Sequence, residues 1–234
     1  LRASKIEAFQ KAIGTVNVFH KDVCVEEEEE EEGECVSILG INTMALEGTP
    51  FDKDVKTSTE NFISQVETKR QSTTNKNPLI LLTHLPMFRE DDTKCGLERS
   101  RETGHVTYGH PSKKMRQKSD VLSQITSKML FNRFKPSLIL SAHTHAVCRH
   151  SHDDNDVLEM TTSAFGWRMR PDPGYLFLSF RNDPSQLDSS LYCKLPHERV
   201  SIAISVTFCV ISGLFAVLGV ILLMCFGRIP RAVP

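Results

Sequence analysis

The feature that most constrains this chain is an uninterrupted apolar segment near its C-terminal end. Residues 200–226 (VSIAISVTFCVISGLFAVLGVILLMCF) contain no charged side chain. As a helix the segment would extend about 40 Å at about 1.5 Å per residue, whereas the hydrocarbon core of a bilayer is about 30 Å thick. A buried helix of a soluble domain would carry a polar stripe, and this segment has only scattered Ser, Thr and Cys. The segment therefore predicts a transmembrane helix, with a cleaved GPI-attachment tail as the alternative.

The chain as a whole has the length and composition of one globular domain with a small appendage. Of the 234 residues 40% are hydrophobic, and 28 Lys and Arg nearly balance 29 Asp and Glu. A nucleic-acid-binding domain usually has a clustered basic surface, so this balance argues against nucleic acid as a partner. The seven glutamates at residues 26–32 predict a solvated loop between two strands; a weak attraction for cations is the alternative.

Charges and cysteines outside the apolar segment say little about its orientation. Lys194 and Arg199 precede the segment, and Arg228 and Arg231 follow it, so the positive-inside rule barely discriminates. The short tail slightly favours a cytosolic C-terminus, which would place the globular part in a lumen or outside the cell. Five cysteines outside the segment permit two disulfides and one free thiol in an oxidising compartment, and their spacing indicates no pairing.

Two short apolar runs each end in histidine. Residues 79–82 (LILL) lead to His84, and residues 138–140 (LIL) lead to His143 and His145. Uniformly apolar runs of this length are typical of strands buried on both faces of a sheet.

Helical spacing of apolar residues separates these strands. It predicts helices at residues 59–69 and 120–132, the second capped by Ser119 or Asp120 with Ile125 facing inward. His150 and His152 would lie in an exposed hairpin connection. A further helix is expected at residues 1–13, and further strands at 16–19, 36–41, 157–161 and 175–180. Alternating strands and helices predict a layered α/β domain.

Histidines at the carboxyl ends of buried strands lie where open α/β sheets place their ligands. In an extended stretch, residues i and i+2 point the same way, so His143 and His145 would face one cavity together with His84. Neutral imidazole binds zinc, manganese and iron. A structural role stays open, because a lone histidine after a strand is often structural and H-x-H also occurs by chance.

The segments around these histidines resemble the last two motifs of the calcineurin-like metallophosphoesterases. LILLTHLPMFR at residues 79–89 and LILSAHTHAVC at residues 138–148 are similar to that family's apolar strand into a histidine and its later strand into G-H-x-H. Residues 162–180 (TSAFGWRMRPDPGYLFLSF) resemble the branch that remodels GPI anchors, which has a similar S-F-x-W-R-x-R segment. The C-K-L-P stretch at residues 193–196, leading into a C-terminal span, is similar as well.

The resemblance implies a four-layer αββα sandwich, whose N-terminal part we expect to be missing here, plus one transmembrane helix. It also implies two divalent metal ions, expected to be Mn²⁺ with Zn²⁺ or Fe as alternatives, about 3.5 Å apart and bridged by hydroxide. His84 and His143 would ligate one ion and His145 the other. Arg168 and Arg170 match the W-R-x-R pattern and would bind phosphate, or else be surface arginines.

Two departures from the family pattern stand out. The D-x-H, G-D-x-x-D and G-N-H-[DE] motifs do not occur, so the leaving-group acid is unknown and we expect this chain alone to be inactive. Ala142 stands where the family usually has glycine; if that position requires positive φ, alanine costs about 1 kcal/mol or shifts the loop.

The expected function is a metal-dependent phosphodiesterase that removes ethanolamine phosphate from a mannose of GPI anchors. It would act on GPI-anchored proteins or the GPI glycan at an endoplasmic reticulum or Golgi membrane, with the catalytic domain in the lumen and membrane lipid around its anchor. The alternatives are a membrane phosphoesterase with another lipid or glycan substrate, and a membrane-anchored pseudoenzyme. We expect the phosphoesterase domain at residues 1–185, a juxtamembrane linker at 186–199, the span at 200–226 and a short tail at 227–234.

Overall fold

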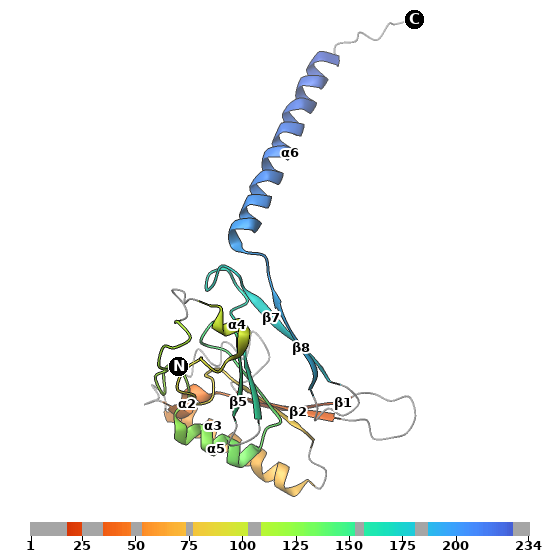
Figure 1. Ribbon diagram of the computed structural model, residues 1–234. Coiled ribbons are helices and arrows are strands. Elements are labelled where there is room, and N and C mark those ends of the chain that lie inside the picture. The colour runs from red at the N-terminus through yellow and green to blue at the C-terminus, as the bar shows by residue number, and fades with distance from the viewer. Residues whose placement is uncertain are drawn as a thin grey trace, which may run out of the picture.

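The computed structural model shows a layered domain from which one long helix projects (Figure 1). It describes residues 18–24, 35–47, 53–73, 77–102, 109–152, 157–180 and 187–226. The expected helix at residues 1–13, the glutamate run at 26–32 and the tail at 227–234 lie outside the described residues.

A six-stranded mixed sheet forms the centre of the domain. Its order is β1-β2-β3-β4-β6-β5, with parallel pairing from β2 through β3 and β4 to β6 and antiparallel pairing at both edges. The strands are β1 (Phe19–Cys24), β2 (Cys35–Ile41), β3 (Leu79–Thr83), β4 (Leu138–Ser141), β5 (Cys148–His152) and β6 (Val157–Thr161).

The apolar runs that predicted β3 and β4 are buried on both faces of this sheet. Leu79 and Leu81 point into a core beneath α3 (Lys53–Ser72) and α5 (Gln124–Phe134), which cover one face. Ile80 alternates with them and packs in a second core on the opposite face. Because both faces are apolar, these strands show no period-2 alternation in the sequence.

A two-stranded sheet covers that opposite face. It consists of β7 (Gly174–Phe180) and β8 (Leu187–Lys194), and Leu176 and Leu178 of β7 pack against the central sheet. The described residues therefore form three layers: helices, central sheet and small sheet. The expected α/β class is confirmed. β8 lies within the range for which we expected a linker, so most of that range is a strand of the domain.

The remaining short helices lie next to the ends of the central strands. α2 (Thr43–Glu47) follows β2, and α4 (Gly96–Ser100) lies in the long connection after β3. Neither was expected from the sequence, because five residues give too short a window for helical periodicity to show.

α5 begins later than expected. Its N-cap is Ser123, whose hydroxyl accepts a hydrogen bond from the backbone N–H of Thr126 at 3.2 Å. Asp120, one of the two expected caps, instead accepts two hydrogen bonds from the Arg116 guanidinium, at 3.0 and 2.9 Å. The expected inward orientation of Ile125 is wrong, because its side chain is 83% exposed.

Two disulfides connect elements of the domain. Cys24 and Cys35 join β1 to β2, and Cys95 joins the connection before α4 to Cys148 of β5. Cys193 of β8 is not in a disulfide. Two disulfides and one free thiol is the outcome that the count of cysteines had allowed.

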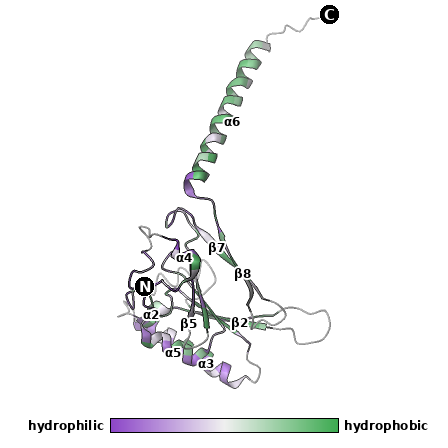
Figure 2. Cartoon of the chain, in the orientation of Figure 1, coloured by the Kyte–Doolittle hydropathy of each residue, from purple (hydrophilic) through white to green (hydrophobic). Residues whose placement is uncertain are grey.

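The C-terminal helix α6 (Glu198–Phe226) is long and apolar enough to cross a membrane. In Figure 2 the ribbon of α6 has the colour of hydrophobic residues along almost its whole length, after a hydrophilic first turn. None of its most apolar stretch is buried against the domain. A helix that is apolar on every side and has no protein to pack against is suited to lipid.

Candidate metal centre

Two neighbouring parallel strands carry the three predicted metal ligands at their carboxyl ends. β3 pairs directly with β4; His84 follows β3, while His143 and His145 lie in the loop after β4. The backbone N–H of Ala142 donates to the carbonyl of His84 at 3.2 Å, which ties the two strand ends together. The parallel register therefore brings residues about 60 positions apart in the sequence to one edge of the sheet.

The ring of His84 meets the ring of His143 edge to face. Nε2 of His84 lies 3.0 Å from Nδ1 of His143, with the ring centroids 4.9 Å apart. This contact is a hydrogen bond between the two rings, so one of the two nitrogens carries the shared proton. Two imidazole nitrogens that bind one ion at about 2.1 Å lie about 3.0 to 3.4 Å apart, so an ion that displaces this proton could be bound by both rings with little movement. Partial burial and the nearby His143 and His145 lower the pKa of His84, which favours the neutral, metal-binding form.

His145 lies in the same loop, and its charge when protonated acts on His84. Among the residues that the structure describes, only Asp92, Cys95 and Cys148 form a group of three metal-ligating side chains with all donor atoms within 4.8 Å. Those two cysteines are bonded to each other, so their sulfurs are not metal ligands. The assignment of His145 to a second ion stays a prediction.

The loop that carries these histidines is a bend, not the extended stretch assumed from the sequence. His143 and His145 both have left-handed backbone conformations, with φ of 68° and 56°. Such conformations cost about 1 to 3 kcal/mol each for a non-glycine residue and cluster at functional sites. Ala142 is not among the residues with positive φ, so alanine in place of the family's glycine strains nothing here.

The two predicted phosphate-binding arginines lie in different surroundings. Arg168 is exposed, so its guanidinium is accessible from solvent. Arg170 is 1% exposed, and its guanidinium donates to the carbonyl of His145 at 2.9 Å and to the carboxylates of Glu102 and Asp172 at 2.9 and 3.0 Å. We expect Arg170 to hold the His145 backbone in place, which leaves Arg168 as the candidate for phosphate contact.

Beneath this edge lies a buried charged residue that the sequence analysis missed. Glu159 of β6 is fully buried and accepts hydrogen bonds from Met87 N–H at 3.0 Å and Ser141 Oγ at 2.6 Å. It also pairs with His152 at 2.9 Å and Arg89 at 3.4 Å. Met87 belongs to the segment after His84, and Ser141 ends β4, so one carboxylate supports both chain segments that carry the histidines.

Several proteins named metallophosphoesterase 1 are similar to this chain over most of its length. The protein from Ailuropoda melanoleuca is 35% identical over 139 residues, which cover 59% of this chain and 32% of the relative. The protein from Xenopus laevis is 30% identical over 190 residues, 73% of this chain and 44% of the relative. The protein from Pongo abelii is 26% identical over 229 residues, 92% of this chain and 51% of the relative.

The chain is a homologue of metallophosphoesterase 1. It spans between 32% and 51% of the length of these three relatives. No protein-family model matches it. Among solved structures, "GAP50 the anchor in the inner membrane complex of Plasmodium" is similar, with a TM-score of 0.41 and 12% identity over 75% of this chain and 43% of that one.

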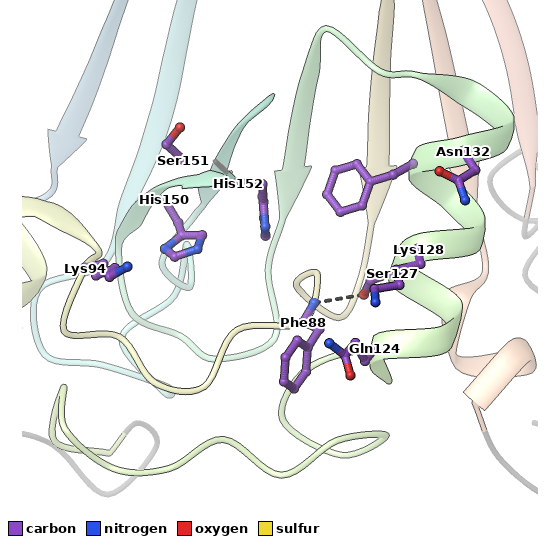
Figure 3. A pocket seen from close by; sticks show the side chains of 10 residues that line it. Phe88, Lys94, Gln124, Ser127, Lys128, Asn132, His150, Ser151 and His152 are labelled. Atoms are coloured by element: carbon purple, nitrogen blue, oxygen red, sulfur yellow. Dashed lines mark hydrogen bonds between the residues drawn. The ribbon is translucent and has the colours of Figure 1, made fainter. Parts of the chain in front are cut away.

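A separate cavity of about 480 Å³ lies between edge strand β5 and helix α5 in this homologue (Figure 3). Figure 3 shows His150 and His152 on the strand side and Gln124 and Lys128 on the helix side. The expected hairpin exists, since β5 pairs antiparallel with β6, but His150 and His152 lie in its first strand and not in an exposed connection, and His152 is 8% exposed. Burial lowers the pKa of His150 to about 4. None of the predicted metal ligands lines this cavity.

Proposed function

We propose that this chain supplies part of the metal centre of a membrane-anchored phosphoesterase. The observation that carries the proposal is the contact of His84 with His143, whose ring nitrogens lie 3.0 Å apart at the carboxyl ends of adjacent parallel strands. Homology to metallophosphoesterase 1 supports the same chemistry. His84 and His143 would hold one divalent ion and His145 a second, and bound ions would activate water and neutralise phosphate charge.

The chain's own residues would shape the site around these ions. Arg168, exposed in the loop before β7, would contact a phosphate oxygen of the substrate. Arg170 would fix His145 through its backbone carbonyl. α6 would span the membrane and hold the domain at its surface. Residues 1–185 would then belong to the phosphoesterase domain.

Metal binding by the purified chain in detergent tests the centre directly. Titration calorimetry with Zn²⁺ and Mn²⁺ should detect a site whose affinity falls at least about tenfold in His143→Ala, because that variant removes one of the ligands. His110→Ala is the matched control, since His110 is an exposed histidine outside the proposed centre. Equal affinity in the wild type and His143→Ala would contradict the assignment.

We further propose a GPI glycan as the substrate, with hydrolysis of the phosphodiester between ethanolamine and mannose. A membrane-bound substrate suits an enzyme anchored at the same surface, since sharing a surface raises their effective concentration. Cells lacking the protein should retain an extra ethanolamine phosphate on mature GPI glycans, measured by mass spectrometry of glycans released from surface proteins. If the glycans are unchanged but the cells lose hydrolysis of another lipid or glycan phosphoester, that molecule is the substrate. If neither the glycans nor any phosphoesterase activity changes, the protein is a pseudoenzyme.

A further inference from the structure

An exposed aromatic loop lies beside the start of α6. Residues 162–173 connect β6 to β7, and Figure 1 shows this connection at the end of the domain from which α6 leaves. Phe165 is 70% exposed and Trp167 is 44% exposed. Large aromatic side chains left in solvent are candidates for contact with a partner or a membrane.

Hydrogen bonds fasten this loop to the chain segment that begins α6. The indole Nε1 of Trp167 donates to the carbonyl of Pro196 at 3.0 Å. The backbone N–H of Glu198, the first residue of α6, donates to the carbonyl of Pro171 at 2.8 Å. The aromatic loop is thus fixed at the point where α6 would leave water and enter the bilayer.

We propose that Phe165 and Trp167 insert into the interfacial layer of the bilayer that α6 spans, giving the domain a second contact with the membrane. The proposal rests on the membrane span of α6 proposed above, and not on the phosphoesterase chemistry. Aromatic rings gather at the boundary between head groups and hydrocarbon. The Trp167 N–H is already paired with Pro196, so its ring enters apolar surroundings without an unsatisfied donor.

This contact would also orient the candidate metal centre. Trp167 and Arg170 are three residues apart, so their Cα atoms lie within about 11 Å of each other. Arg170 in turn donates to the carbonyl of His145. The same loop would therefore contact the membrane at one end and the histidine loop at the other, and it would hold the metal centre at a fixed distance from the lipid head groups. The class of substrate that this favours is a phosphoester attached to a membrane lipid.

Trp167 is the single tryptophan of the chain, so its fluorescence reports on this loop alone. The full chain would be reconstituted into phosphatidylcholine vesicles with bromines placed at shallow or at deep acyl carbons. We expect shallow bromines to quench the emission about twofold and deep bromines to quench it less, because interfacial rings stay near the head groups. In Phe165→Ser the quenching should weaken, since one of the two inserting side chains is lost.

Phe177→Ser is the matched control, because Phe177 is a 60% exposed aromatic residue in the middle of β7, outside the loop of residues 162–173, where it pairs with Leu191 of β8. Its quenching should equal that of the wild type. Absence of quenching in a chain that resists carbonate extraction would overturn the proposal, and so would an equal loss in Phe165→Ser and Phe177→Ser. If alkaline carbonate extracts the chain, both this proposal and the membrane span of α6 are overturned. The metal-binding proposal is unaffected, because the titration of the wild type and His143→Ala tests it separately.

Discussion

Glu159 offers the sharpest test of how the central sheet is held together below the histidines. Its carboxylate is fully buried and accepts from the Met87 N–H and the Ser141 hydroxyl, at 3.0 and 2.6 Å. It also faces two cationic or proton-donating side chains, His152 at 2.9 Å and Arg89 at 3.4 Å. Replacing Glu159 would leave these four groups buried without that acceptor.

The expected cost follows from the loss of a buried charge partner. Removing one member of a buried ion pair destabilises a protein by about 3 to 5 kcal/mol, so Glu159→Ala should fall in that range. At about 2 to 4 °C per kcal/mol for a domain of this size, the melting temperature should fall by about 6 to 20 °C. Glu159→Gln keeps the shape and one acceptor oxygen, so its loss should be smaller.

The pH dependence of the free energy of unfolding gives a second, independent test of the role of Glu159. Burial opposes ionisation of Glu159, but the hydrogen bond from His152 and the charge of Arg89 outweigh it, and the pKa of Glu159 is lowered. A carboxyl whose pKa is lower in the folded state stabilises the protein above its unfolded pKa of about 4.3. That stabilisation is lost as pH falls below this value toward the folded pKa. Glu159→Gln should therefore flatten the stability profile in acid.

The assay is thermal unfolding in detergent, followed by circular dichroism between pH 3 and 8, a range set by the pKa of an ordinary carboxyl near 4. Glu98→Gln is the control, since Glu98 is half-exposed and pairs with Lys194 at 2.9 Å on the surface. A surface pair contributes about 1 kcal/mol or less, so this variant should melt near the wild type. Similar small shifts in the Glu98 and Glu159 variants would refute the reasoning.

Two other outcomes follow from the fold. Replacing Cys95 and Cys148 by serine should lower the free energy of unfolding by about 4 kcal/mol, against about 3 kcal/mol for Cys24 and Cys35, because the sequence separations are 53 and 11 residues. A larger loss of melting temperature for the shorter loop would contradict this. Alkaline carbonate should leave the chain in the membrane pellet and detergent should release it; release by carbonate alone would count against a span by α6.

The sequence predicted those parts of the fold whose burial shows as a pattern of apolar residues along the chain. β3 and β4 were found because runs such as 79–82 are apolar on both faces of the sheet. β5 was missed because its five residues, CRHSH, alternate between buried and exposed without an aliphatic side chain. The start of α5 was placed too early because Asp120 has the chemistry of a cap, and only the structure shows that Arg116 binds it.

The sequence predicted that His84 and His143 lie close together, but it did not predict the backbone of the loop that carries His143. Because β3 and β4 are neighbouring parallel strands, their carboxyl ends meet, and this alone brings His84 close to His143 whatever the conformation of the loop after β4. The left-handed conformations of His143 and His145 depend on contacts of the whole loop, so the assumption of an extended stretch was wrong. The burial of Arg170 could not be foreseen either, because Glu102 lies 68 residues before it in the sequence.

The buried charges explain why the histidine edge can be rigid although its own loop is strained. Glu159 gave no signal, since a single glutamate in a short apolar strand is expected to face solvent. In the fold it supports the segment after β3 through Met87 and the end of β4 through Ser141. Two left-handed histidines cost about 2 to 6 kcal/mol together, and such strain persists only where the surrounding structure over-determines it. The hydrogen bonds of Glu159 constrain the two strand ends, and Arg170 constrains the His145 backbone. The geometry of a bound metal would therefore depend on residues that do not contact the ion.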